Sequence, residues 1–361
     1  MSFSRLWTIA RLDLTQRIRT VSWYVLLGIF ALLLLATTIL SFFTFASLED
    51  RGPGVYSVVV FITLLLVVLV SPTLSGNTIN GDRDAATLAP IQVTQARTAE
   101  ILLGKFLAAW ITGLAFAVVA VPFLVVAAAV GGGVNPLTVV VSTAVLVVEA
   151  GVVAALGTAF SGILARPLFS VAATYLVVAA LCVGTLIGFG LVGSSMTSEQ
   201  THRYQSAKYD PVTGAPECKD GSDDCWNDPT QLICEDESVQ TYDVPRFDRV
   251  WWMLAPNPFA ILADATPADF SNIGEPVDLF GGVKYGLRQT QLPPELESTY
   301  NECSRQADEP RASAAEVVAT TVPSWFVGLG LQIVLAGLLL GWAGMRTRTP
   351  ARKLPPGTRI A

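Results

Sequence analysis

Six apolar stretches dominate this sequence, and each meets or approaches the roughly 20 residues that a helix needs to cross a bilayer. They are predicted at 21–46, 55–74, 105–130, 137–164, 168–193 and 325–345. Lipid offers the backbone no hydrogen-bond partners, so stretches of this kind must be helical. The sequence therefore predicts an all-α polytopic membrane protein with six transmembrane helices.

Basic residues flank these spans unevenly, and this asymmetry predicts their orientation. With both termini inside, the inner segments hold 13 Lys and Arg residues, whereas the two short outer loops hold only Arg51. Short loops rich in Lys and Arg stay in the cytoplasm. We therefore expect cytoplasmic termini, a basic cytoplasmic tail at 346–361, and an extracytoplasmic domain at 194–321 between the fifth and sixth spans.

The first twenty residues show an amphipathic pattern at helical spacing. One face would carry Phe3, Leu6, Trp7, Ala10, Leu14 and Ile18. Such a helix is expected to lie on the inner leaflet. It would act either as a simple membrane anchor or as an elbow that positions the first span.

Several functional classes do not fit this composition. Of the 29 acidic residues, 22 lie within 194–321, and Lys and Arg form only short flanks, so nucleic acid is not an expected partner. An intramembrane zinc protease needs two histidines at helical spacing, whereas His202 is the only histidine and lies in the outer segment. The sequence also lacks the inverted repeat of many secondary transporters. We therefore expect a protein that is not itself an enzyme.

The segment between the second and third spans carries the most specific motif. It reads Gly-Asp-Arg-Asp-Ala-Ala-Thr-Leu from Gly81 to Leu88 and closes with Glu-Ile-Leu-Leu-Gly-Lys from Glu100 to Lys105. This pattern resembles the type-2 ABC exporter permeases, in which an acidic-basic-acidic triplet and a Thr-Leu pair precede such an entry into the third span. Ala86 stands where that family usually has Gly.

The resemblance implies a permease subunit whose segment 75–104 receives force from a separate ATPase, with ATP and Mg bound by that partner. It assigns this ATPase coupling to Asp82, Arg83, Asp84, Thr87, Leu88, Glu100 and Lys105. It also implies a second permease subunit, contact with membrane lipid, and a location in the bacterial plasma membrane. The alternative is that the charged triplet only solvates a turn and that Lys105 extends to the membrane interface.

The chain shows no phosphate-binding loop of its own. Such a loop needs Gly-x-x-x-x-Gly-Lys followed by Ser or Thr. The only Gly-Lys pair is Gly104-Lys105, and Phe106 follows it. ATP hydrolysis is therefore expected in a partner chain, and no cofactor or metal is expected in this one.

One acidic residue falls inside a predicted span. Glu149 lies near the middle of the fourth span, where an ionised carboxylate costs roughly 3 kcal/mol or more. It must therefore be protonated, paired or in contact with water. We expect Glu149 on a translocation path or at a subunit contact, or else as a protonated side chain bonded to a neighbouring helix.

The outer segment holds the remaining candidate residues. Four of its cysteines form an even set, which in an oxidising compartment predicts two disulfides with three connectivities left open: Cys218, Cys225, Cys234 and Cys303. A metal site is the less favoured alternative, because the segment has no Cys-x-x-Cys pair. Trp251, Trp252 and Phe259 lie in a Pro-interrupted apolar run that suits the headgroup layer. The run looks like the outer interfacial helices of the same permease family, and the core of the outer domain is the alternative.

Two functions fit this outline. In the first, two permease subunits line an export path and two ATPases drive it from beneath. In the second, the subunit relays ATPase motion through its outer domain to a cell-envelope partner and carries no substrate. In either case, we expect charge reversal at Asp82 and Arg83 to weaken the association with the ATPase.

Overall fold

The computed structural model describes residues 2–46, 51–84, 97–221, 225, 229–303 and 312–347. In these residues, six helical segments are long and apolar enough to cross a membrane. They are α2 (Val21–Thr44), α3 (Gly52–Ser75), α6 (Thr98–Gly131), α7 (Pro136–Ile163), α8 with α9 (Pro167–Ala179 and Thr185–Ser195) and α13 (Trp325–Thr347). The prediction of six helices with the length and apolar composition of membrane spans is confirmed.

The third span begins earlier than predicted, at Thr98 rather than near Lys105. Hydropathy places the start too late because the first turns of the helix contain charged residues. Glu100 accepts a hydrogen bond from the backbone N–H of Arg97 at 2.9 Å, and this bond caps the helix. The closing motif from Glu100 to Lys105 is therefore part of α6 itself.

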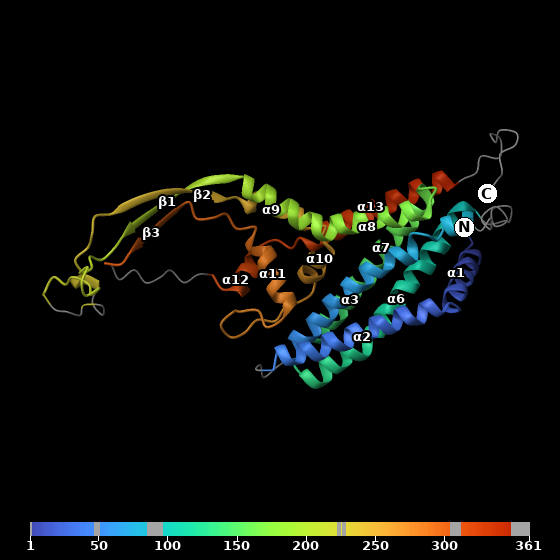
Figure 1. Cartoon of the computed structure of the whole chain (residues 1–361), viewed down its shortest axis with the longest axis horizontal. Coiled ribbons are helices and arrows are strands. Elements are labelled where there is room, and N and C mark those ends of the chain that lie inside the picture. The colour runs from blue at the N-terminus through green and yellow to red at the C-terminus, as the bar shows by residue number, and fades with distance from the viewer. Residues whose placement is uncertain are drawn as a thin grey trace.

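α3 and α7 form the centre of the bundle, and the other spans pack around them (Figure 1). Most of α3 and α7 is buried, whereas α2, α6, α8, α9 and α13 expose broad apolar faces. Such faces are unfavourable in water and suit lipid. Small residues allow the closest helix contact, because a Cβ at Gly157 of α7 would collide with Ser75 Oγ at the end of α3.

A π-helical turn, η1 (Ala180–Gly184), joins α8 to α9 within the fifth span. Such turns disturb the regular backbone hydrogen bonding of a helix and often mark functional sites. Here Asn257 of the outer segment donates from Nδ2 to the Cys182 carbonyl at 2.7 Å and to Thr185 Oγ1 at 3.0 Å. The outer segment is thereby anchored to the interrupted span.

Two short helices lie at the end of the bundle where α13 ends (Figure 1). α1 (Phe3–Ile18) precedes the first span, and α4 (Asn80–Asp84) follows α3. The described residues of 194–321, which we call the outer segment after their predicted side, lie at the opposite end. This separation agrees with the predicted topology, and the assignment of one end to the cytoplasm stays a prediction.

Part of the outer segment is a three-stranded sheet. The protein is therefore not entirely helical, although the sequence predicts an all-α fold. β1 (Thr197–Gln205) pairs antiparallel with β2 (Ser238–Pro245) and parallel with β3 (Glu297–Asn301), in the order β2-β1-β3. The strands contain polar residues on both faces, so the alternating pattern that normally reveals a strand is weak. β1 starts directly after α9, so the sheet continues the fifth span outward.

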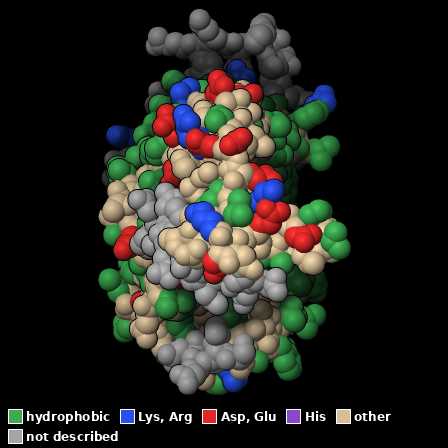
Figure 2. Space-filling view, turned by 90° about the vertical axis from the view of Figure 1, so that its left-hand side faces the viewer, with side chains coloured by type: hydrophobic (Ala, Val, Ile, Leu, Met, Phe, Trp, Pro, Cys, Tyr) green, Lys and Arg blue, Asp and Glu red, His purple; other side chains and the backbone are tan. Residues whose placement is uncertain are grey.

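Two disulfides hold the far end of this sheet, as predicted. They join Cys218 to Cys225 and Cys234 to Cys303. The second disulfide links the residues just before β2 to those just after β3, so it fastens the two outer strands on either side of β1. Figure 2 looks onto this end of the molecule and shows acidic and basic side chains interspersed on it.

The remaining regular elements of the outer segment are short helices and 3₁₀ turns. They are the 3₁₀ turns η2 (Pro229–Gln231), η3 (Phe247–Arg249) and η4 (Trp251–Leu254) and the helices α10 (Pro258–Ala265), α11 (Leu279–Gln289) and α12 (Ala314–Thr320). Of these, η3, η4, α10 and α11 contact the spans. Ile261 of α10 and Phe280 of α11 are fully buried in one core cluster with Val59 of α3. The apolar core is therefore continuous from the bundle into the outer segment.

Candidate functional site

The short helix α4 is held against the end of α7 by hydrogen bonds to its first residues. Ser161 Oγ of α7 accepts from the backbone N–H groups of Ile79 and Asn80, at 2.9 and 3.1 Å. The Asn80 side chain in turn donates to Ser170 Oγ of α8 at 3.1 Å. These bonds satisfy donors that a helix start leaves unpaired, and they fix α4 to two spans.

Arg83 adds a charged attachment between α4 and the last turn of α7. Its Nη1 donates to the Leu164 carbonyl and its Nη2 to the Gly162 carbonyl, each at 3.2 Å. Nη1 also reaches Asn80 Oδ1 at 3.0 Å. A cation is favourable at this position, because the carbonyl groups at a helix C-terminus are unpaired and carry partial negative charge.

Lys105 of α6 connects three helices through ion pairs. Its Nζ lies 2.5 Å from Asp82 Oδ2 of α4 and 3.5 Å from Asp13 Oδ1 of α1. Arg17 pairs with Asp13 at 3.0 Å, one turn further along α1. The Lys105 side chain is only 7% exposed, so these carboxylates replace the water that its charge has lost. We call Asp13, Arg17, Asp82 and Lys105 the ionic cluster.

Glu100 makes a second attachment between α1 and α6. Its Oε1 accepts from the backbone N–H of Ser2 at 2.7 Å, while Oε2 accepts from Arg97. One carboxylate therefore caps the starts of two helices. This position is electrostatically favourable for an acid, since both helix N-termini present unpaired N–H groups.

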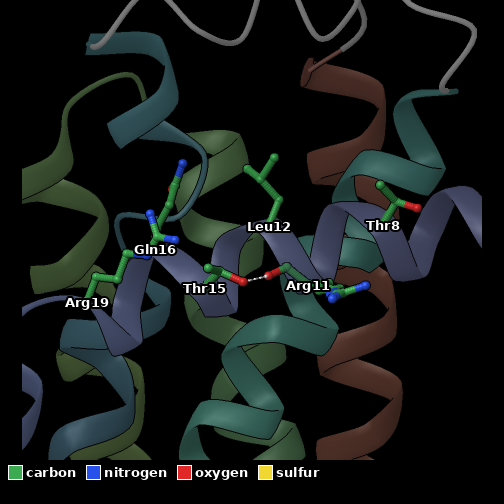
Figure 3. A pocket seen from close by; sticks show the side chains of 6 residues that line it. All are labelled: Thr8, Arg11, Leu12, Thr15, Gln16 and Arg19. Carbon is green, nitrogen blue, oxygen red and sulfur yellow. Dashed lines mark hydrogen bonds between the residues drawn. The ribbon is translucent and has the colours of Figure 1, made fainter.

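α1 packs on α6 by one face and exposes the other. Gly104 provides room for Ile9 at this contact, because a Cβ at Gly104 would lie 3.0 Å from the Ile9 side chain. The exposed side forms a shallow groove of about 380 Å³, lined by Thr8, Arg11, Leu12, Thr15, Gln16 and Arg19. Figure 3 shows these six side chains along the single helix, with Thr15 bonded to the Arg11 carbonyl. The groove is thus a basic surface at the same end as the ionic cluster.

The structure brings four of the residues predicted for coupling to one end of the bundle: Asp82, Arg83, Glu100 and Lys105. Asp84 lies beside them and is exposed, whereas Thr87 and Leu88 lie outside the described residues. Sequence reasoning missed Asp13. A signal for it exists, because Asp13 is the only acidic residue before Glu49 and lies in an otherwise basic helix.

The contacts of Asp82 and Arg83 are directed inward. Both side chains bind other helices of the same chain, so their interactions hold α4 in place. Asp84 is the exposed member of the triplet. The triplet therefore combines two residues that fix the helix and one that is free to meet a partner surface.

Glu149 of α7 is completely buried, between α7 and α13. Gln332 of α13 lies within hydrogen-bonding reach of its carboxyl group. Among the described residues, neither Glu149 oxygen accepts a hydrogen bond, and Gln332 Oε1 also lacks a donor. In this conformation Glu149 lines no open path, so a role in translocation requires the helices around it to separate.

A groove of about 300 Å³ lies nearby, among α6, α7 and α13. It is almost entirely apolar, and Phe106 and Trp110 form one wall with ring centroids 5.8 Å apart. The indole N–H of Trp110 donates to the Val147 carbonyl at 2.9 Å, so no polar group is left unpaired there. The groove suits an acyl chain or an apolar helix face.

The outer aromatic residues divide between the core and the surface. Phe259 of α10 stacks on Phe61 of α3, with ring centroids 6.3 Å apart, and belongs to the core. Trp252 is 60% exposed, and Trp251 is half-buried. The run predicted as an interfacial helix is thus a 3₁₀ turn and a mostly buried helix separated at Pro256.

A buried ion pair that sequence reasoning missed fastens the outer segment to the last span. Arg288 Nε of α11 donates to Asp264 Oδ1 of α10 at 2.6 Å, and Arg288 also donates to the Thr321 carbonyl at 2.6 Å. Asp264 Oδ2 accepts from the backbone N–H groups of Ser324 and Trp325, at 2.6 and 3.0 Å, and so caps α13. We call the pair of Asp264 and Arg288 the outer clamp.

No family model matches this chain, and no curated protein is significantly similar to it.

Proposed function

We propose that this chain is the membrane-spanning permease subunit of an ABC-type exporter, driven by a separate ATPase that binds ATP and Mg. The observation that carries the proposal is the ionic cluster. It joins α4, in the segment that resembles the coupling region of type-2 exporter permeases, to α1 and α6. Arg83 and Ser161 join the same helix to α7.

This connectivity supports force transmission for a simple mechanical reason. A short exposed helix connected to the bundle only through one flexible loop would move without displacing the bundle. α4 instead has bonds to the ends of α6, α7 and α8, so a push on α4 displaces several spans together. α1 would move with them, because Asp13 binds Lys105 and Glu100 binds the start of α1.

The proposal places the ATPase at the end of the bundle that holds α1 and α4. Asp84 and the basic groove of α1 provide charges of both signs for a partner surface. A second permease subunit would pack against the exposed apolar spans. The apolar groove among α6, α7 and α13 is one such face.

The experiment is purification of the tagged chain from its native membrane, followed by measurement of ATP hydrolysis in the complex. Asp84→Lys should lose the ATPase, because it reverses an exposed charge without breaking a bond to any other described residue. Lys105→Met should keep the ATPase but reduce the coupling of ATP turnover to movement of the spans. Glu199→Lys reverses an exposed acid on the three-stranded sheet and serves as the matched control.

The result that contradicts the proposal is a folded chain that purifies without any nucleotide-binding partner. A complex in which Asp84→Lys and Lys105→Met both leave association and ATP turnover unchanged would contradict the role of α4. Correct folding of each variant is checked by its thermal unfolding in detergent, so loss of function and loss of structure are separated.

The mechanical function has one specific observation in its favour. The fifth span continues directly from α9 into β1, and the two disulfides brace the far end of the sheet. Motion of this span would therefore reach a point far from the membrane (Figure 1). Reconstituted vesicles distinguish the two functions: an exporter moves substrate and its ATP turnover responds to that substrate, whereas a transmitter shows neither.

A further inference from the structure

Three buried oxygen atoms between α7 and α13, within the part of the chain that the structure describes, lack hydrogen-bond donors. They are both carboxyl oxygens of Glu149 in α7 and Oε1 of Gln332 in α13. Glu149 is 0% exposed and Gln332 is 1% exposed. Buried polar atoms of this kind cost about 1 to 3 kcal/mol each when they stay unpaired, so the site calls for a hydrogen-bond donor that none of the described side chains supplies.

The orientation of the Gln332 amide is fixed by the outer segment. Its Nε2 donates to the Pro256 carbonyl at 2.9 Å. If the amide were turned over, Oε1 would face that carbonyl, and two acceptors would repel each other. Oε1 must therefore point away from Pro256, and it stays without a donor among the described residues, as do both oxygens of the neighbouring Glu149 carboxyl group.

We propose that Glu149 binds a proton and donates it in a hydrogen bond to Gln332 Oε1, which makes this pair a proton-binding site between α7 and α13. A single proton satisfies Gln332 Oε1 and removes the charge from Glu149. The remaining carboxyl oxygen is then a neutral acceptor, which is far less costly to bury than an ionised group.

The surroundings favour a proton over a metal cation. A sodium or calcium ion needs several oxygen ligands, whereas the neighbouring buried positions on α7 are Leu146, Ala150 and Val153. The titratable group that faces Glu149 from the fifth span is the Cys182 thiol, and a thiol at neutral pH carries no compensating positive charge. Only a neutral carboxyl group suits this environment.

The site also connects the membrane core to the outer segment. Gln332 binds the Pro256 carbonyl, and the next residue, Asn257, binds the Cys182 carbonyl of the π-helical turn. Release of the proton would leave a charge that needs water, and water can reach it only if α7 and α13 separate. Proton release and opening of this helix contact are therefore linked, independently of whether an ATPase drives the opening.

The test is infrared spectroscopy of the full chain in lipid nanodiscs, which detects the carbonyl stretch of a protonated carboxylic acid. At about pH 7, Asp278, whose pKa is raised by burial to about 6, is mostly ionised and contributes little. We expect a protonated-acid band in the wild-type chain that disappears in Glu149→Gln. Glu199→Gln, at an exposed glutamate, should retain the band and serves as the control.

A second variant tests the acceptor. In Gln332→Met the proton loses its partner, so the band should persist and shift to the higher frequency of a free carboxylic acid. The proposal is overturned if the wild-type band is absent, if it survives in Glu149→Gln, or if it does not shift in Gln332→Met. It is also overturned if the band appears only when sodium is removed, because the site then holds a cation.

Discussion

Removal of Arg288 from the outer clamp should be the most damaging single change in the outer segment. Asp264 is 0% exposed and Arg288 is 4% exposed at their side chains, so neither charge has water to replace its partner. Breaking a buried pair on one side costs about 3 to 5 kcal/mol. Asp264 keeps its bonds from Ser324 and Trp325 at the start of α13. The cost of Arg288→Met should therefore lie near the lower end of this range, at about 3 kcal/mol.

The assay is equilibrium unfolding of the purified chain in mixed detergent micelles. Arg203→Met breaks a pair whose side chains are about half exposed, and it should cost less than about 1 kcal/mol. The decisive comparison is the double variant Arg288→Met with Asp264→Asn. It removes the stranded charge but keeps an oxygen that can cap α13, so it should be more stable than Arg288→Met alone.

Two results would refute this reasoning. The first is a cost below about 1 kcal/mol for Arg288→Met, which would mean that water or another cation reaches Asp264. The second is a double variant no more stable than the single one. In that case the loss would come from packing of the long Arg288 side chain and not from an unpaired carboxylate.

Other positions allow shorter tests. Gly328→Ala should detach the outer segment from α13 and increase proteolysis of the outer segment, because the added Cβ collides with the Ala255 carbonyl. Gly330→Ala, with open space around its Cβ, should leave proteolysis unchanged. Loss of the disulfide Cys234–Cys303, which closes a separation of 69 residues, should destabilise the sheet by about 4 kcal/mol. Loss of Cys218–Cys225, with a separation of 7, should destabilise it by about 2 to 3 kcal/mol. Chemical denaturation of each double-serine variant measures both. Burial raises the pKa of Asp278 to about 6, so the folded chain binds this proton more tightly than the unfolded chain. The resulting stabilisation is present at low pH and is lost as the pH rises through about 6. Asp278→Asn should abolish that part of the pH dependence of thermal unfolding.

The sequence predicted the spans well because the signal for a membrane helix is local and strong. Each apolar run is long, and lipid leaves the backbone no choice but a helix. The predicted start differs most at the third span, where the charged residues Glu100 and Lys105 lie inside the helix. Their partners, Ser2 and Asp13, are far away in the chain, so no local pattern could indicate that these charges are paired.

The four outer cysteines show the same difference between what a local sequence pattern predicts and what long-range contacts decide. Their even number predicted two disulfides, but the connectivity depends on which strands are neighbours. Because the start of β2 and the end of β3 both pair with the last residues of β1, Cys234 and Cys303 come together at that end of the sheet. The sheet itself was not predicted, since its strands are held by pairing with distant segments rather than by an apolar face.

The sequence by itself determined that six helices are long and apolar enough to cross a membrane, that most acidic residues fall in the segment 194–321, and that one segment resembles a coupling region. Only the tertiary structure decided what the charged residues do. Asp82 binds Lys105, Asp264 binds Arg288, and Glu149 meets Gln332 across two spans. The physical reason is that hydropathy acts through each short stretch separately, whereas a buried charge is tolerated only where folding brings it a partner.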